Sequence, residues 1–558
     1  MKYSQIVEVY ESLSKTNGKI EKAEILSKFF IILDGKSKYD WIYLLKGKVA
    51  PDYDSREFGI SRQLVLKAIS RTYGIDAGKV LDRFKKIGDL GELAYEYSEK
   101  RKQGALFSEK LDVEKVFSSL KKIMDIEGDG AVDKKLGIIS ELLGNATPSE
   151  AKYIIRTLLN DLRIGVADGI IRDALNKAFG NSEEDFSEKV QSAYDMTADF
   201  SLVFREGVNQ FKDFEKISIF PGRAFNVMLS VKVESIDEGF EVCGKPCAFE
   251  YKYDGFRMVI SKSEGKINLF TRRLENVTNQ FPDVVEYVKK NVHGENFILD
   301  SEVVGFEPKS GKYMPFQYIS QRIKRKYDIE KIIDKLPVEV NVFDVLYLND
   351  KSLLKTNFID RRKILEKIFK QEKRKIALSK QLITDSVEKA EDFYNEALKV
   401  GEEGVMVKKL DAPYQPGRRV GYLAKLKPNV NDLDLVIVGA EHGTGKRAGW
   451  LSSYIVACKD GDKFLEIGKV SSGLKEKEEE GTTYEEMTKL LKPLVIEDKG
   501  SYFSIKPKII VSVTYQNIQK SPSYSSGYAL RFPRITAYRP DRSFKDIASL
   551  REIEKEIV

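Results

Sequence analysis

The sequence predicts a multidomain protein with three consecutive parts, which are all-α, α+β and all-β. Its 558 residues are too many for one hydrophobic core, since a domain takes roughly 150 residues. The spacing of the apolar residues also changes along the chain, near Phe225 and again at Asn429. We therefore expect three domains, at residues 1–217, 218–428 and 429–558.

The first part is expected to be helical because its apolar residues recur at spacings of three and four. Residues 151–162 are an example, in which the apolar side chains fall on one helical face: Ile154, Leu158, Leu159 and Leu162. The pattern predicts a domain made of packed helices.

The second part mixes two periods. Short apolar runs separated by Gly-, Asp- or Lys-rich turns predict strands at 248–253, 257–260, 297–299 and 338–346. Helical patterns interrupt them near 359–372 and 387–400. In the third part only the strand pattern continues, at 433–439, 453–457, 463–468 and 509–515. Several short strands with Gly-rich turns are typical of a small barrel.

Composition and charge limit the class of protein but do not identify its binding partner. Hydrophobic residues make up 42% and charged residues 32%, with a net charge of +7, which permits nucleic acid as a partner but does not require it. The opening segment lacks the apolar core of a signal peptide, and no later run is long enough to span a membrane. We expect a cytoplasmic protein.

Cysteine and histidine are too few for several kinds of site. Cys243 and Cys247 are separated by three residues, and Cys458 is remote, so we expect three reduced thiols and no structural zinc. The chain has two histidines, His293 and His442, neither in a ligand-spaced cluster. Any chemistry must therefore use Lys, Arg and carboxylates.

The sharpest local feature is Glu250-Tyr-Lys-Tyr-Asp-Gly-Phe-Arg257. It is typical of a hairpin, in which a strand enters an Asp-Gly turn and leaves as a second strand. Alone, a Lys-x-Asp-Gly pattern is weak in a Lys-rich chain. Further charged or aromatic motifs follow it in order, on or beside predicted strands: Thr271-Arg-Arg273, Leu299-Asp-Ser-Glu302, Phe343-Asp-Val-Leu-Tyr347, Glu403-Gly-Val-Met-Val-Lys408, Leu423-Ala-Lys-Leu-Lys427 and Arg531 to Arg542.

This ordered set resembles the nucleotidyltransferase superfamily of ATP-dependent DNA ligases and capping enzymes, and specifically the archaeal and eukaryotic replicative DNA ligases. Leu162-Arg-Ile-Gly-Val-Ala-Asp-Gly169 also resembles their DNA-binding domain, so the resemblance covers essentially the whole chain. It implies a helical DNA-binding domain, an adenylation domain and an OB-fold. It further implies ATP as AMP donor, Mg²⁺, and nicked double-stranded DNA as substrate in replication, repair and recombination.

The resemblance also assigns roles to residues of the motifs. Lys252 is the expected catalytic residue, which becomes linked to AMP. Glu250 is expected at the adenine edge, Phe343 against the base, and Glu403 with Glu302 at the metal. The remaining nucleotide-binding residues are Arg257 and Glu302 at the ribose, and Arg272, Arg419, Lys425 and Lys427 at or near the phosphates.

Physical chemistry supports this arrangement independently. A lysine amine attacks a phosphate only when it is neutral, and neighbouring cations favour the neutral form. Arg257, Arg272, Lys425 and Lys427 are expected to supply that field and to neutralise phosphate charge during transfer. Mg²⁺ prefers one or two carboxylates together with phosphate oxygens and water.

Three questions stay open at this point. An RNA ligase or guanylyltransferase shares the lysine motif, although such enzymes generally lack the long N-terminal part, and a non-catalytic DNA-binding relative is a further alternative. Gln103 to Phe107 resembles a segment that binds the sliding clamp, but it also fits a polar connection between helices. Arg539 and Arg542 are expected either at the β- and γ-phosphates or on a basic surface strand. A monomer is expected.

Overall fold

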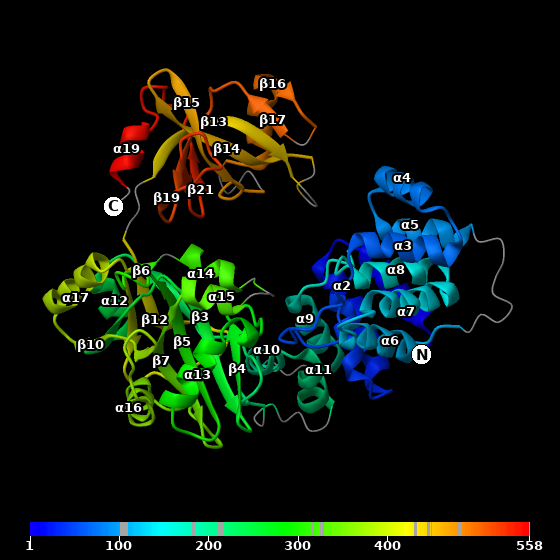
Figure 1. Cartoon of the computed structure of the whole chain (residues 1–558), viewed down its shortest axis with the longest axis horizontal. Helices are drawn as coiled ribbons and strands as arrows, with labels where there is room; N and C mark the ends of the chain where they lie inside the picture. The colour runs from blue at the N-terminus through cyan, green and yellow to red at the C-terminus, as the bar shows by residue number, and fades with distance from the viewer. Residues whose placement is uncertain are drawn as a thin grey trace. The chain divides into compact units, whose positions relative to one another are not determined.

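The computed structural model consists of two compact units, Met1–Lys427 and Pro428–Val558 (Figure 1). It describes residues 1–100, 110–180, 185–209, 214, 217–314, 316–323, 325, 329–428, 432–443, 447, 449–476, 482–500 and 502–556. Within these ranges, each helix is too short or too polar to cross a membrane.

Helices form the N-terminal part of the first unit, around one hydrophobic core that extends from Tyr3 to Ile217. They are α1 (Tyr3–Lys15), α2 (Lys19–Asp34), η1 (Tyr39–Lys46), α3 (Arg62–Tyr73), α4 (Ala77–Ile87), α5 (Leu90–Glu99), α6 (Val113–Asp125), α7 (Ala131–Asn145), α8 (Pro148–Leu158), α9 (Asp168–Phe179), α10 (Phe186–Thr197), α11 (Phe200–Leu202) and the π-helix η2 (Val203–Asn209).

Helix α8 shows how the local sequence sets the ends of these helices. Thr147 caps its N-terminus in a capping box with Glu150, and proline occupies the first turn. The helix ends at Leu158, because Asn160 adopts a left-handed conformation with φ 52°. The predicted helix over 151–162 is therefore too long, although Leu162 is still buried in the same core.

The rest of the first unit is built on two sheets. One has five strands in the order β1-β12-β11-β2-β10, and the other has the path β4-β3-β5-β7-β8 with β6 and β9 at its sides. Their strands are β1 (Leu229–Val233), β2 (Cys247–Tyr251), β3 (Phe256–Ser263), β4 (Lys266–Thr271), β5 (Phe297–Phe306), β6 (Tyr313–Met314), β7 (Val338–Leu348), β8 (Lys351–Ser352), β9 (Ile376–Leu378), β10 (Gln381–Thr384), β11 (Val405–Lys409) and β12 (Arg419–Leu426).

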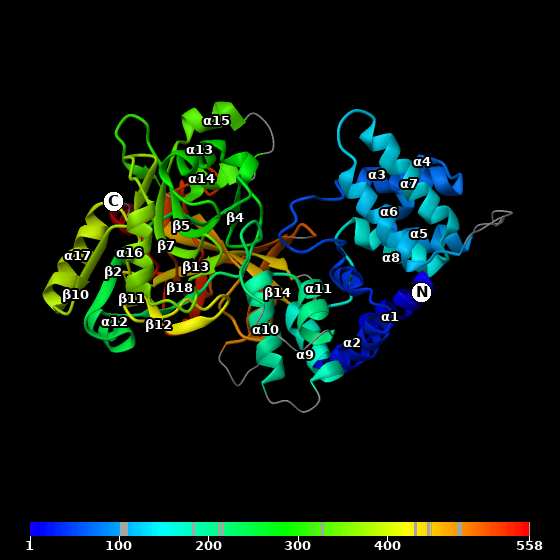
Figure 2. The ribbon, with the colours of Figure 1, turned by 90° about the horizontal axis from the view of Figure 1, so that it is seen from below.

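Helices cover both sheets. Figure 2 shows α12 and α17 together beside the five-stranded sheet, and their apolar residues share a core with β2 and β11. A further cluster contains residues of both sheets, including Val259, Ile298, Val420 and Leu423. The helices are α12 (Ile236–Cys243), α13 (Pro282–Asn291), α14 (Phe316–Ile323), α15 (Ile329–Lys335), α16 (Phe358–Ile368) and α17 (Val387–Lys399).

The segment between β2 and β3 differs from its sequence prediction. We expected a hairpin around Asp254-Gly255, but β2 pairs with β10 and β11 whereas β3 pairs with β4 and β5. The hairpin prediction is wrong because β2 pairs with strands that lie more than 100 positions later, whereas β3 pairs with the next strand, β4, and with β5. The turn instead carries the chain from one sheet to the other, with Lys252 at the crossing.

The second unit is rich in strands around a separate core. Strand β13 is central, because its first half pairs with β18 and its second half with β17. Its elements are β13 (Leu433–His442), β14 (Leu451–Asp460), β15 (Lys463–Val470), α18 (Tyr484–Leu491), β16 (Val495–Asp498), β17 (Tyr502–Ile505), β18 (Ile510–Thr514), β19 (Ile518–Lys520), β20 (Tyr528–Leu530), β21 (Arg534–Tyr538) and α19 (Leu550–Lys555).

Candidate nucleotidyl-transfer site

Lys252 lies just beyond the end of β2, and its backbone is fixed on both sides. Its N–H donates to Gly404 O at 2.9 Å, and Glu403 N–H donates to Lys252 O at 2.9 Å. Gly404 has φ +132°, and a Cβ there would lie 2.2 Å from Leu426 O. Only glycine fits this position, so the Glu-Gly pair brings Glu403 beside Lys252.

Two lysines share one oxygen of Glu403. The Nζ atoms of Lys252 and Lys427 lie 2.5 Å and 2.6 Å from Glu403 Oε2. Burial opposes ionisation of this carboxyl, but the two ammonium groups outweigh it and lower the pKa of Glu403 to about 2. Glu403 is therefore ionised at neutral pH and holds both amines.

Further cations lie near the Lys252 and Glu403 side chains. Burial lowers the pKa of Lys425, and the charges of Lys252, Lys427, Arg419 and Arg272 lower it further. Lys425 and Lys427 are half-buried, whereas the two arginines are exposed. The predicted phosphate-facing cations come from β12 and the residue after it and from the turn after β4, and they lie near one another and near Lys252.

Glu302 projects from β5 opposite Arg257 of β3. The pKa of its carboxyl is raised to about 7, mainly by burial; the positive charges of Lys252 and Arg257 oppose this rise, and the carboxylates of Glu403 and Asp300 add to it. Glu302 and Glu403 thus lie within electrostatic reach of each other and of Lys252.

Arg257 occupies a buried ionic network rather than an open site. Its Nε and Nη2 donate to the two oxygens of Asp300 at 2.9 and 2.6 Å, and its Nη1 donates to Met228 O at 2.7 Å. Tyr414 Oη accepts from Arg257 and donates to Asp300 at 2.7 Å. Asp300 therefore compensates the positive charge that we expected Arg257 to lend to the site.

Glu250 and Phe343 form a second group, around Lys408. Lys408 Nζ lies 2.6 Å from Glu250 Oε2 and 4.5 Å from the centre of the Phe343 ring. Arg257 lies 5.6 Å from the same ring. Phe343 is half-buried between buried neighbours on β7, so part of its ring is accessible.

Sequence reasoning assigned no role to four residues at this site: Lys408, Glu402, Asp300 and Tyr414. Glu402 is 5% exposed, and its Oε2 accepts a hydrogen bond from Asp254 N–H at 3.2 Å. Burial, followed by the nearby carboxylates, raises the pKa of Glu402 to about 8. Lys408 ends the Glu403 motif and Glu402 directly precedes it, so the available signal for Lys408 was a charged residue inside a strand-like run.

Two further predictions concern Arg539 with Arg542, and Gln103 to Phe107. Arg539 and Arg542 belong to the second unit, where they pair with Asp541 at 2.7 Å and with Asp434 at 3.3 Å respectively. Gln103 to Phe107 lies outside the described residues.

Residues 2–176 match the model of the DNA ligase N terminus, 227–427 the ATP dependent DNA ligase domain, and 447–542 the ATP dependent DNA ligase C terminal region. The DNA ligase of Nanoarchaeum equitans is 45% identical over 100% of this chain and 98% of its own length. The chain belongs to the ATP-dependent DNA ligase family.

Other relatives agree with this membership. The DNA ligase of Thermococcus fumicolans is 40% identical over 100% of this chain and 98% of its own length. A solved structure named Pmar-Lig_Pre matches 96% of this chain and 99% of its own, with a TM-score of 0.55 and 18% identity, which supports the fold alone. The resemblance, the three-part fold class and the assignment as an ATP-dependent DNA ligase are confirmed.

Proposed function

We propose that this ligase seals single-strand nicks in duplex DNA through an adenylate on Lys252. Lys252 Nζ attacks the α-phosphate of ATP, loses its proton and releases pyrophosphate. The 5′-phosphate of the nick then takes AMP from the lysine, and the adjacent 3′-hydroxyl displaces AMP to form the phosphodiester. The observation that carries the proposal is the amine of Lys252, fixed between Glu403 and a group of cations.

The residues divide into a phosphate end and a base end. Lys425, Lys427, Arg272 and Arg419 would bind the phosphates, where preorganised cations stabilise the charge that develops during transfer. Phe343 would stack on the adenine and Glu250 would lie at its edge. Arg257 and Glu302 would face the ribose, with Arg257 held in place by Asp300.

Magnesium fits the two carboxylates at this site. Glu302 is half-buried and the pKa of its carboxyl is raised, and Glu403 is an ionised carboxylate whose present partners are ammonium groups. We propose that Glu302 and Glu403 hold Mg²⁺ together with nucleotide phosphates, since this hard cation takes few protein carboxylates. When bound, Mg²⁺ withdraws charge from the phosphate oxygens. Asp254 is a further carboxylate that would orient Lys252 or a metal-bound water.

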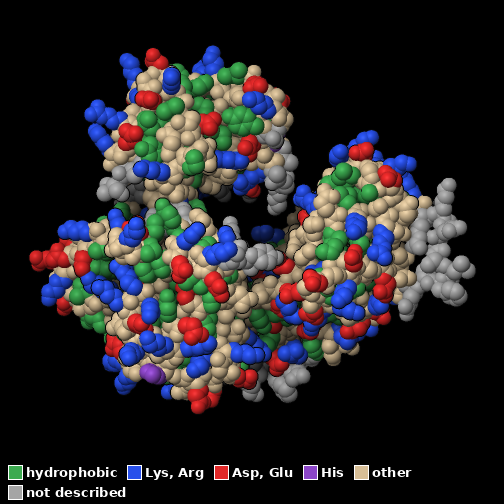
Figure 3. Space-filling view, in the orientation of Figure 1, with side chains coloured by type: hydrophobic (Ala, Val, Ile, Leu, Met, Phe, Trp, Pro, Cys, Tyr) green, Lys and Arg blue, Asp and Glu red, His purple; other side chains and the backbone are tan. Residues whose placement is uncertain are grey.

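The parts of the chain outside the adenylation site would bind the DNA substrate. We assign residues 1–217 to DNA binding, 218–428 to adenylation and 429–558 to the OB-fold. Figure 3 shows Lys and Arg side chains interspersed with Asp and Glu on this face of the molecule, so DNA would be held through local clusters of phosphate contacts. We further propose a cytoplasmic monomer that acts in replication, repair and recombination and uses Gln103 to Phe107 to bind a sliding clamp.

The deciding experiment follows label from ATP carrying ³²P at the α-phosphate. Wild-type protein with Mg²⁺ should acquire label that survives denaturation, and nicked DNA should discharge it while the strands join. Lys252→Ala should acquire none. Lys266→Ala is the matched control, because Lys266 is an exposed lysine on β4, and it should label normally.

The same assay tests the related activities. Labelling by GTP alone, or discharge by RNA ends alone, would favour a capping enzyme or an RNA ligase over the proposed DNA ligase. Absence of label with every nucleotide would refute the lysyl-AMP intermediate.

A further inference from the structure

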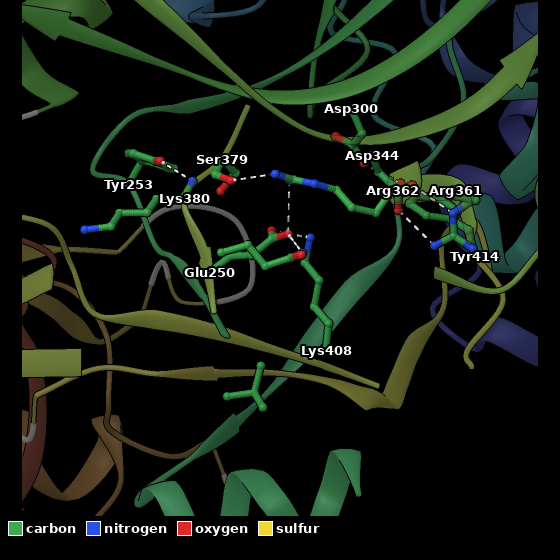
Figure 4. Close-up of polar contacts among 12 residues, drawn as sticks. Glu250, Tyr253, Asp300, Asp344, Arg361, Arg362, Ser379, Lys380, Lys408 and Tyr414 are labelled. Carbon is green, nitrogen blue, oxygen red and sulfur yellow. Dashed lines mark hydrogen bonds and ion pairs between the residues drawn. The ribbon is translucent and has the colours of Figure 1, made fainter. Parts of the chain in front are cut away.

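The carboxylate of Glu250 lies between Lys408 and Arg362 (Figure 4) and also contacts Gln381. Its side chain is 2% exposed, and its Oε2 lies 2.6 Å from Lys408 Nζ. Its Oε1 accepts a hydrogen bond from Gln381 Nε2 at 2.8 Å, and Arg362 Nη1 lies 3.9 Å from the same oxygen. An ionised carboxylate this deeply buried requires a cation, and Lys408 is the nearest one.

Lys408 is fixed by its own surroundings. Its side chain is 10% exposed, and its ammonium lies 4.5 Å from the centre of the Phe343 ring and 4.7 Å from that of Phe358. On the sheet, Lys408 pairs with Ala248 and is therefore a diagonal neighbour of Glu250. One ammonium group thus contacts both residues proposed to bind the base, which are Glu250 and Phe343.

The charge on Glu250 has a consequence for base recognition. An ionised carboxylate can only accept hydrogen bonds, whereas a protonated carboxyl can also donate one. Each carboxylate oxygen has two lone pairs, so Glu250 retains capacity to accept after binding Lys408 and Gln381. Adenine presents an amine at position 6, which donates. Guanine presents a carbonyl there, which would face another acceptor.

We propose that Lys408 determines nucleotide specificity by keeping Glu250 an acceptor, and so selects adenine over guanine in the adenylation step. The proposal rests on the proposed function, in which Glu250 lies at the edge of the base. Lys408 acts through Glu250 and Phe343, so it is a positioning residue rather than a catalytic one.

Arg362 is the other cation near Glu250, and it is the weaker partner. Its Nη1 is 1.3 Å farther from the carboxylate than Lys408 Nζ, since the two separations are 3.9 and 2.6 Å. Its other nitrogens already donate to Glu366 at 3.0 Å and to Ser379 O at 3.2 Å. Without Lys408, the buried carboxylate of Glu250 would therefore lack a close cation.

The test compares Lys252 labelling by ATP and by GTP, each ³²P-labelled at the α-phosphate, in five full-length variants. In Lys408→Met, the preference for ATP should fall on the order of tenfold to a hundredfold, the range expected for one hydrogen bond to a charged group. Lys408→Arg should retain the preference because it keeps the cation. Lys409→Met is the matched control, since Lys409 is the exposed neighbour on β11, and it should behave as wild type.

The fourth variant combines Lys408→Met with Glu250→Gln and is compared with Glu250→Gln alone. The second substitution should add little once the carboxylate is gone, because Lys408 acts through it. A ratio of ATP to GTP labelling is insensitive to the fraction of folded protein, so a loss of stability does not imitate the effect. An unchanged ratio in Lys408→Met would overturn the inference, and absence of label in wild type would refute the proposed function instead.

Discussion

The ammonium of Lys252 lies 2.5 Å from Glu403 Oε2, although 151 positions separate the two residues in the sequence. Their backbones are also joined, because Glu403 N–H donates to Lys252 O. The carboxylate holds the amine in place and attracts a second lysine, Lys427, to the same oxygen. Because one carboxylate binds both ammonium groups, the side chains of Lys252 and Lys427 are positioned before nucleotide binds.

Removing the charge of Glu403 should therefore slow adenylation of Lys252. In Glu403→Gln, the two ammonium groups lose their common partner and repel each other, so we expect a decrease on the order of 10²- to 10³-fold, as for loss of one preorganised charge contact. Single-turnover labelling with ATP measures this rate. Glu391→Gln on the exposed side of α17 is the control, and a normal rate in Glu403→Gln would contradict the role.

Glu402 should make the stability of the chain depend on pH. Burial raises its pKa from 4.5 to about 8 in the folded protein, so between these values the folded chain retains a proton that the unfolded chain has lost. Stability should then fall as pH rises, by about 1.4 kcal/mol per pH unit, and level off above the folded pKa.

Glu402→Gln removes this titration and leaves an oxygen that can accept from Asp254 N–H. Urea unfolding at a series of pH values should give a shallower decline in the free energy of unfolding for the variant than for wild type. Glu388→Gln, at an exposed position of α17, should keep the wild-type slope. Equal slopes for Glu402→Gln and wild type would show that Glu402 ionises normally in the folded chain.

The contribution of the buried network around Arg257 to stability can be tested by comparing Tyr414, which belongs to the network, with Tyr422, which does not. Tyr414 Oη accepts from Met228 N–H and Arg257 and donates to Asp300. Tyr422 Oη is buried and, among the described residues, has no hydrogen-bond partner. We expect Tyr414→Phe to lower the free energy of unfolding by about 1–3 kcal/mol and Tyr422→Phe to change it little. Similar urea midpoints for the two variants would refute this difference.

Local sequence was sufficient to predict the type of many elements. The run at 338–346 became β7 and the patterns near 359 and 387 became α16 and α17. Here the apolar spacing, caps and turn residues all favour the same local structure. The order of the motifs also indicated the family, since the residues that it singled out around Lys252 lie near one another in the structure.

Partners across long sequence separations could not be predicted in the same way. The Asp-Gly turn after Lys252 is locally typical of a hairpin, but β2 and β3 pair in different sheets. The partner of Arg257 is Asp300, which lies 43 positions away, and Lys408 finds Glu250 from β11. Such pairings depend on strand register. A sequence pattern predicts which face of the sheet a side chain lies on, but not which residue of the neighbouring strand it contacts.

Gly255 follows the Asp254 turn and should tolerate no side chain. A Cβ at this position would lie 2.3 Å from Val303 O and 3.1 Å from Glu302 Cγ, so alanine must push β3 away from β5 at the point where Glu302 enters the site. We expect Gly255→Ala to reduce both the thermal midpoint and Lys252 adenylation. Gly421→Ala on β12 is the control, since its Cβ would meet nothing within 4 Å. Wild-type adenylation in Gly255→Ala would mean that the two strands can separate without moving Glu302, and that the glycine serves the turn alone.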